Sequence, residues 1–139
     1  MENIESKQGK VNTSAEKVFN FLTDLRNLDS LIPQDKVQNW QSAEDTCSFT
    51  VAQAGDIQLK ISDKQPFSMI KVDPEGKTPI GFSFYIQLKE LGEDDTRIKL
   101  TFRAEMNTMM KMMIKSPVQK ALDKIVETLG TLPLDTFNQ

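Results

Sequence analysis

The sequence contains no histidine, the commonest general base and a frequent metal ligand in proteins. This absence excludes the serine and cysteine dyads that depend on an imidazole, and it removes most zinc sites. The chain has one cysteine, Cys47, so neither an intramolecular disulfide nor a thiolate cluster for zinc can form. We find no catalytic motif, and we expect no metal and no cofactor.

Long apolar runs and basic clusters are also missing. No stretch approaches the ~20 apolar residues of a membrane-spanning helix, and MENIESKQGK lacks the apolar segment of a signal peptide. The 17 Lys and Arg residues are scattered among 20 Asp and Glu, so the formal net charge of −3 argues against nucleic acid as a partner. We expect a cytoplasmic protein without stable membrane insertion, folded as one domain over residues 1–139.

The N-terminal part predicts an edge strand followed by two short helices. Residues 4–11 form the polar strand candidate. Thr13 and Glu16 have the spacing of a capping box, which satisfies free backbone N–H groups where a helix begins. A second short turn, RNLDSLIP, is expected to end before Pro33, because a residue that precedes proline avoids the helical conformation. Apolar residues recur at helical spacing at Ala15, Val18, Phe19, Leu22 and Leu25.

From residue 37 to residue 106 the apolar residues alternate instead, which is typical of strands with one dry face. Short turn signals such as SAED and LGEDDT separate these segments and predict antiparallel pairing between neighbours. We expect about six strands here, and together with the N-terminal strand they form one curved sheet. The alternation is clearest in CSFTV, IQLKI, IGFSFYIQL and RIKLTFRA.

The segment SPVQKALDKIVETLG, residues 116–130, predicts a long helix. We expect Ser116 at its N-cap, Pro117 at the first helical position, Gln119 in a second capping box and Gly130 at the C-terminal cap. A curved sheet with one dry face needs a cover, and a helix wrapped by the sheet leaves part of the concave volume unfilled. The apolar stripe of this helix consists of Val118, Ala121, Leu122, Ile125, Val126 and Leu129.

The eight residues MNTMMKMM, 106–113, hold five of the seven methionines. On a helical wheel their apolar sector is centred about 110° from the stripe of the following helix. One straight helix cannot press both sectors onto one surface, so we expect a break near residues 115–117 and a separate methionine-rich turn. The cluster suits core packing, a deformable cavity entrance, a protein-docking face, a membrane interface or, without Cys or His nearby, copper(I) ligation.

The order of these elements resembles the START-like (SRPBCC) helix-grip superfamily, and within it the polyketide cyclase/dehydrase and lipid-transport-like proteins. The resemblance rests on VNTSAEKVFNFLTDLRNLDSLIP, the run of strands, and MMKMMIKSPVQKALDKIVETLG, which together cover nearly the whole chain. It implies an α+β fold in which a curved antiparallel sheet of six to seven strands grips a long C-terminal helix. It also implies a pocket for a hydrophobic small molecule, but it carries over no catalytic residue.

We therefore expect a hydrophobic or amphipathic small molecule, such as a lipid, to bind between the sheet and the final helix, selected by shape and volume. Two alternatives remain. A docking protein that uses the methionine-rich face would expose those side chains. A cyclase- or hydrolase-type enzyme would need a buried polar group, such as Arg103 or Glu105. The predicted lining is Phe49, Leu59, Ile61, Phe82, Phe84, Leu100 and Phe102, with Met106, Met110 and Met113 near the entrance.

Three further residues have features that could serve a ligand. Cys47 shares the inward parity of its strand, and a buried thiol without a basic neighbour is expected to be inert. Trp40 suits rim or core packing, with stacking on a planar ligand as the alternative. Asp24, at the end of the first helix, is expected to be solvated or to cap a helix rather than to catalyse.

Overall fold

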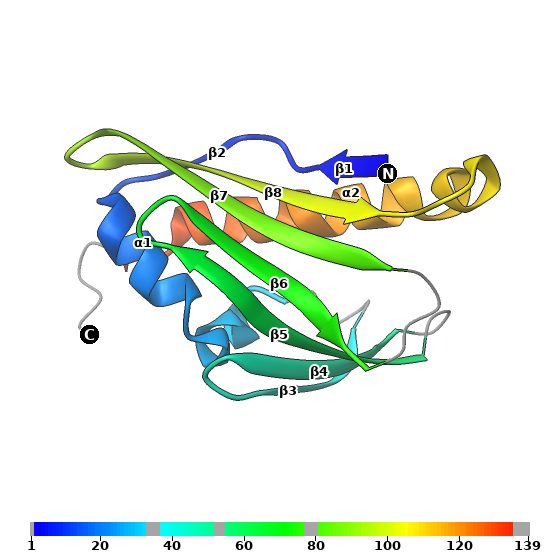
Figure 1. Ribbon diagram of the computed structural model, residues 1–139. Helices are drawn as coiled ribbons and strands as arrows, with labels where there is room; N and C mark the ends of the chain where they lie inside the picture. The colour runs from blue at the N-terminus through cyan, green and yellow to red at the C-terminus, as the bar shows by residue number, and fades with distance from the viewer. Residues whose placement is uncertain (1, 33–36, 52–54, 77–80, 135–139) are drawn as a thin grey trace.

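In the computed structural model, residues 2–32, 37–51, 55–76 and 81–134 are described. An antiparallel sheet curves around a long C-terminal helix, which lies along its concave side (Figure 1). The order in the sheet is β1-β8-β7-β6-β5-β4-β3, and β2 also pairs with β8. The predicted helix-grip architecture is confirmed.

The sheet contains one strand more than the upper end of the predicted range. Residues 4–11, expected to form one strand, contribute two, because Ser6 interrupts them. The N–H of Ser6 donates to the carbonyl of Leu100 at 2.8 Å, and its hydroxyl accepts from the N–H of Leu100 at 2.9 Å. The strands are β1 (Glu2–Glu5), β2 (Gly9–Val11), β3 (Gln38–Ser42), β4 (Thr46–Val51), β5 (Gly55–Gln65), β6 (Met69–Glu75), β7 (Phe82–Gly92) and β8 (Asp95–Ala104).

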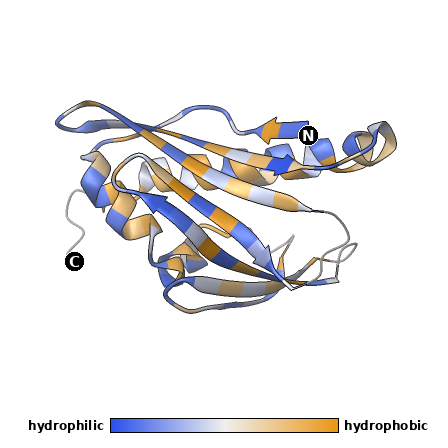
Figure 2. Ribbon diagram, in the orientation of Figure 1, coloured by the Kyte–Doolittle hydropathy of each residue, from blue (hydrophilic) through white to orange (hydrophobic). Residues whose placement is uncertain are grey.

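Strand alternation determines which side chains face the helix. In β5, Ile57, Leu59 and Ile61 are buried, whereas the residues between them are exposed. The same alternation colours β5 to β8 in Figure 2. The inward rows of neighbouring strands meet in register, for example Ile86 opposite Leu100, so they form one continuous apolar surface.

Two short helical elements follow β2 and close one end of the sheet. They are α1 (Ala15–Leu22) and the 3-10 helix η1 (Leu25–Ser30). Asp24 caps η1, since its carboxylate accepts from the N–H of Arg26 at 3.1 Å. The same carboxylate accepts hydrogen bonds from the Arg26 guanidinium, which lower the pKa of Asp24. Its observed role is the capping role expected from the sequence.

The cap of α1 lies one residue later than the sequence predicted. The hydroxyl of Ser14, not Thr13, accepts from the N–H of Lys17 at 3.3 Å, so Glu16 has no capping-box partner at Thr13. Thr13 is instead buried, and its carbonyl accepts from the Thr96 hydroxyl at 2.8 Å. The contact with β8 therefore decides which of two adjacent hydroxyl residues caps the helix.

The predicted break before the terminal helix is wrong. One helix, α2 (Thr108–Thr131), runs from the methionine-rich segment to the end of the apolar stripe, with Pro117 inside it. Its N-cap is Asn107, whose side chain accepts from the N–H of Met110 at 2.8 Å, so Ser116 is not a cap. Among the residues that the structure describes, no helix is long and apolar enough to cross a membrane.

Contacts on both sides of Pro117 hold α2 as one element. Upstream, the ammonium of Lys111 forms an ion pair with Glu2 of β1 at 2.5 Å. Downstream, Leu122, Val126 and Leu129 are buried against the sheet. Because the helix continues, its two apolar sectors stay about 110° apart, and the sheet cannot cover both completely. In the upstream sector Met106 and Ile114 pack against the core, whereas Met109, Met112 and Met113 face solvent with exposed fractions of 71%, 79% and 64%.

Two glycines allow α2 to approach β2 closely. A Cβ at Gly9 would lie 2.2 Å from Cγ1 of Val126, and one at Gly130 would lie 3.0 Å from the carbonyl oxygen of Lys10. Gly130 was expected to cap the helix, but the cap is Leu132 in an extended conformation. Gly130 is thus explained by packing between the helix and the strand rather than by helix termination.

Candidate functional site

A cavity of about 230 Å³ lies between the α1–η1 corner, the concave face of the sheet and α2. Nearly all of its lining is apolar, because the sheet, the corner and the helix each turn an apolar face toward it. The lining residues are Leu22, Leu25, Leu28, Leu31, Ile32, Val37, Trp40, Cys47, Phe49, Leu59, Val72, Phe84, Tyr85, Ile86, Leu100, Val118, Ala121, Leu122 and Ile125.

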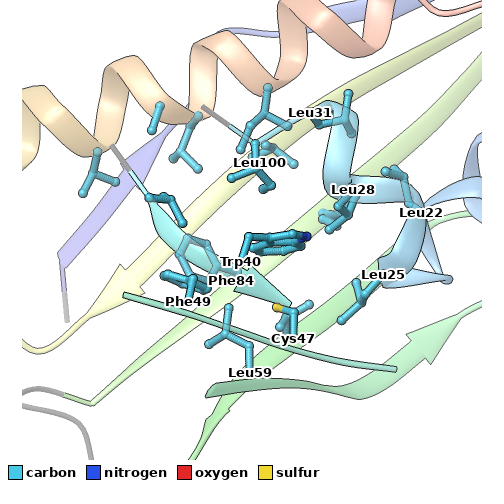
Figure 3. Close-up of a pocket in the computed structure, with 18 of the residues that line it drawn as sticks. Leu22, Leu25, Leu28, Leu31, Trp40, Cys47, Phe49, Leu59, Phe84 and Leu100 are labelled. Atoms are coloured by element: carbon cyan, nitrogen blue, oxygen red, sulfur yellow. The ribbon is translucent and has the colours of Figure 1, made fainter. Parts of the chain in front are cut away.

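The corner and the sheet face each other across this cavity. In Figure 3 the labelled leucines of α1 and η1 lie on one side and Phe49 and Phe84 on the other, with the indole of Trp40 between them. The rings of Trp40 and Phe49 stack with centroids 5.9 Å apart and an interplanar angle of 25°. This pair forms a flat aromatic wall.

The polar end of Trp40 is held outside the cavity. Its indole N–H donates to the carboxylate of Asp29 in η1, and the hydroxyl of Ser42 donates to the same carboxylate at 3.1 Å. The hydrogen bond satisfies the one donor of the indole, so the ring can line an apolar space without leaving a polar atom unpaired. Asp29 thereby ties the wall of the cavity to the helical corner.

The downstream half of α2 is divided between core and cavity. Val126 and Leu129 are buried in the core, whereas Val118, Ala121 and Ile125 are only partly buried and line the cavity. These three positions lie within about 60° of one another on the wheel, so they form the roof over the sheet. One edge of the apolar stripe predicted from the sequence therefore packs in the core, and the other edge lines the cavity.

Ionisable groups are scarce around the cavity. Burial raises the pKa of the Cys47 thiol to about 12, so at neutral pH it is a small apolar group, as its parity predicted. Tyr85 pairs with Lys71 across β6 and β7, and its ring lies 5.7 Å from the Lys71 ammonium. No group of His, Cys, Asp and Glu within the described ranges could hold a metal ion.

Four predicted lining residues, Phe49, Leu59, Phe84 and Leu100, line the cavity. The other three strand residues do not belong to the lining. Ile61 is buried in the core, and the rings of Phe82 and Phe102 pack around Phe84, with centroids 5.7 and 5.1 Å from it. The three rings therefore pack side by side on the same face of the sheet, and Phe84 alone of them reaches the cavity.

The methionines predicted at the entrance are not among the lining residues. Met106 and Met110 are partly buried, and Met113 is exposed. Arg103 and Glu105, the polar groups that the enzyme alternative would turn inward, are also exposed. The structure therefore brings neither the methionines nor these charged side chains to the cavity.

The lining residues of the helical corner and of the downstream half of α2 were not predicted, although the pocket was expected between the sheet and this helix. The corner leucines were recognisable, since Leu22 and Leu25 had already been assigned to an apolar face. Their role was missed because apolar spacing identifies a buried face without showing whether that face meets side chains or empty space. The same limit applies to Ala121 and Ile125.

Comparison with known proteins identifies the fold alone. No protein-family model and no curated protein matches the sequence. A START superfamily protein from Mycobacterium smegmatis is similar in structure with a TM-score of 0.64 at 16% identity, covering 91% of this chain and 98% of that one. The Aha1 dimer from Colwellia psychrerythraea gives a TM-score of 0.67 at 19% identity, covering 95% of this chain and 100% of that one.

A third similar structure belongs to a biosynthetic pathway. The di-domain ARO/CYC protein BexL of BE-7585A biosynthesis gives a TM-score of 0.65 at 10% identity, covering 93% of this chain and 46% of that one. The chain therefore has a START-like helix-grip fold. At these identities the likeness carries no activity to this chain.

Proposed function

We propose that this protein binds one small hydrophobic molecule, or the apolar part of an amphipathic one, in the cavity beneath α2. The observation that carries the proposal is an apolar space of about 230 Å³ bounded by three separate elements. Atoms around such a space lack contact partners on one side, and an apolar ligand restores those contacts. With few polar groups in the lining, selection rests on shape and volume.

The size of the cavity narrows the class of ligand. A dry cavity of about 150 Å³ accommodates benzene, so about 230 Å³ suits one or two rings or a single short acyl chain. Two long acyl chains exceed it. The flat wall formed by Trp40 and Phe49 favours a planar ring, since stacked aromatic pairs contribute about 0.5–1.5 kcal/mol beyond area burial.

The experiment fills the cavity with a larger side chain on α2 and measures the binding of a neutral fluorescent probe. The two-ring probe 1-aminonaphthalene is titrated into wild type, Ala121→Trp and the control Ser116→Trp, which places the same bulk on the exposed side of α2. We expect Ala121→Trp to weaken binding at least tenfold and Ser116→Trp to change it less than twofold. Equal affinities for the three proteins would remove the cavity as the binding site.

The natural ligand is sought by native mass spectrometry of protein purified from its own host. An adduct that survives in wild type and is missing from Ala121→Trp, but present in Ser116→Trp, identifies a cavity ligand. Extraction then gives its chemical identity. Repeated recovery of bare wild-type protein together with absent probe binding would contradict the proposal.

A second candidate function is docking of a protein partner on the methionine-rich face of α2, defined here as Met109, Met112 and Met113. The observation that favours it is their exposure of 64–79% within two helical turns. Unbranched, polarizable side chains adapt to varied partner surfaces. Replacing all three by Ser should abolish a specific association in the host and leave probe binding unchanged. Loss of probe binding instead would connect these residues to the cavity.

A further inference from the structure

A row of cations crosses the outer face of the sheet where β2, β8 and β7 lie side by side. Lys10 is the register partner of Arg97, and Arg97 is the register partner of Lys89. Lys99, two residues further along β8, points to the same face. Directly opposite side chains have Cβ atoms about 5 Å apart, so like charges at such positions destabilise a sheet.

The same face is hollowed beside these cations. The amide of Gln87 lies at the hollow, and its Oε1 accepts from the hydroxyl of Thr101 at 3.3 Å, which leaves its NH₂ group available as a donor. Two amide side chains and three cations thus surround a floor made by the ladder between β7 and β8. The residues that line the hollow are Gln8, Gln87, Leu88, Lys89, Arg97, Ile98 and Lys99.

Local carboxylates neutralise only part of this charge. Asp95 accepts two hydrogen bonds from the Arg97 guanidinium, at 2.8 and 3.2 Å, and Glu5 accepts one from Lys99 at 2.9 Å. Lys10 and Lys89 form no ion pair within the described part of the chain. Two positive charges therefore remain on this face, although the whole chain has a formal net charge of −3.

Protection of a sheet edge and local ion pairing each explain only part of this row of cations. A lysine on an edge strand prevents edge-to-edge aggregation, which explains Lys10 on β2. It does not explain Lys89 and Arg97, because β7 and β8 lie inside the sheet. The ion pair with Asp95 holds the Arg97 guanidinium in a defined orientation and leaves further N–H groups for an anion.

We propose that this hollow binds a phosphoryl group. A phosphate group carries about −1.5 to −2 charges at neutral pH and presents several strong acceptor oxygens, which matches the cations Lys89, Arg97 and Lys99 and the amide donors of Gln8 and Gln87 in the lining. Lys10, opposite Arg97 on the neighbouring strand, adds positive charge beside the hollow. A bound anion also relieves the repulsion along the cation row. The phosphoryl group belongs either to a soluble phosphate ester or to an anionic lipid headgroup.

The first test measures binding of inorganic phosphate and pyrophosphate by amide chemical shifts. Wild type is compared with Lys10→Gln/Lys89→Gln and with the control Lys60→Gln/Lys64→Gln, which removes two exposed lysines of β5. We expect saturable shifts around Lys89, Arg97 and Lys99, at least tenfold weaker binding in the first variant and less than a twofold change in the control. Equal losses in both variants would show unspecific ion attraction and overturn the proposal.

Vesicles distinguish the two sources of the phosphoryl group. If a lipid headgroup is the source, wild type and the Lys60/Lys64 control sediment with phosphatidylglycerol vesicles but not with phosphatidylcholine vesicles, and the Lys10/Lys89 variant stays in solution. Binding of soluble phosphate without sedimentation identifies a soluble ligand. Binding to neither probe overturns the proposal.

Thermal unfolding provides a second readout, separate from the chemical-shift titration. In phosphate-free buffer, Lys89→Gln should raise Tm by about 1–3 °C, because it removes a like-charge contact. At equal ionic strength, added phosphate should raise the Tm of wild type more than that of Lys10→Gln/Lys89→Gln, because phosphate as a salt stabilises both proteins and specific binding adds to this in wild type. A lower Tm for Lys89→Gln, or the same phosphate effect in both proteins, would contradict the argument.

Discussion

The two halves of α2 belong to one helix and have opposite surroundings. Upstream of Pro117, Met109, Met112 and Met113 face solvent, whereas downstream Val126 and Leu129 are buried against the sheet. Both halves are amphipathic by pattern, and their apolar sectors differ mainly in direction. An apolar sector is therefore buried only if the rotation of the helix about its axis, set by its strongest contacts, turns that sector toward the core.

We expect truncation of a core side chain to give the largest difference in the free energy of unfolding between the two halves of α2. Leu129→Ala removes a fully buried side chain from the downstream half and should lower the free energy of unfolding by about 2–5 kcal/mol. The matched change Met113→Ala in the upstream half should alter it by less than about 0.5 kcal/mol. Urea unfolding monitored by Trp40 fluorescence measures both, and similar losses would mean that the upstream half is buried in solution.

Pro117 tests whether the two halves form one helix. A proline inside a helix lacks one hydrogen bond donor, so Pro117→Ala should raise the free energy of unfolding by about 1–3 kcal/mol. At the first position of a separate helix, the same change would be neutral or destabilising. Chemical denaturation decides between these outcomes, and Ser116→Ala serves as the control at an adjacent exposed position.

The packing of the downstream half of α2 against β2 can be tested by a substitution in the strand. Gly9→Ala places a methyl group within 2.2 Å of Val126, so either the helix or the strand must move, at an expected cost of about 1–3 kcal/mol. Gly81→Ala is the control, because no atom lies within 4 Å of its added methyl group. A thermal shift that is equal for both variants would show that the close approach is not maintained in solution.

The smallest perturbation uses chemical probes on the unchanged protein. Dilute peroxide should oxidise Met109, Met112 and Met113 before the partly buried Met69, which peptide mass spectrometry can follow. Cys47, with a pKa raised to about 12, should resist alkylation at pH 8 until the protein unfolds. Rapid alkylation of native protein would show that the cavity opens readily.

The sequence predictions were accurate where a feature depends on neighbouring residues, and they failed where contacts between residues far apart in the sequence decided it. The inward parity of Leu59, Phe84 and Leu100 was predictable, because alternation along a strand is a local property. The cap of α1 moved from Thr13 to Ser14 because Thr13 bonds to β8, a contact 83 residues away in sequence. The sequence showed that the methionine sector and the downstream stripe point in different directions, but it carries no local signal for which of them is buried or for the empty space beneath Ala121.

The sequence by itself determined the order of helices and strands and the side of each strand that turns inward, because both depend on neighbouring residues only. The tertiary structure decided the rest. Burial of Leu122, Val126 and Leu129 and the close approach of Val126 to Gly9 fix the position and rotation of α2 on the sheet. A rigid helix can bury only one of two apolar sectors that point in different directions, so this rotation directs Met109, Met112 and Met113 outward. The same position of the helix leaves a cavity between α2 and the sheet.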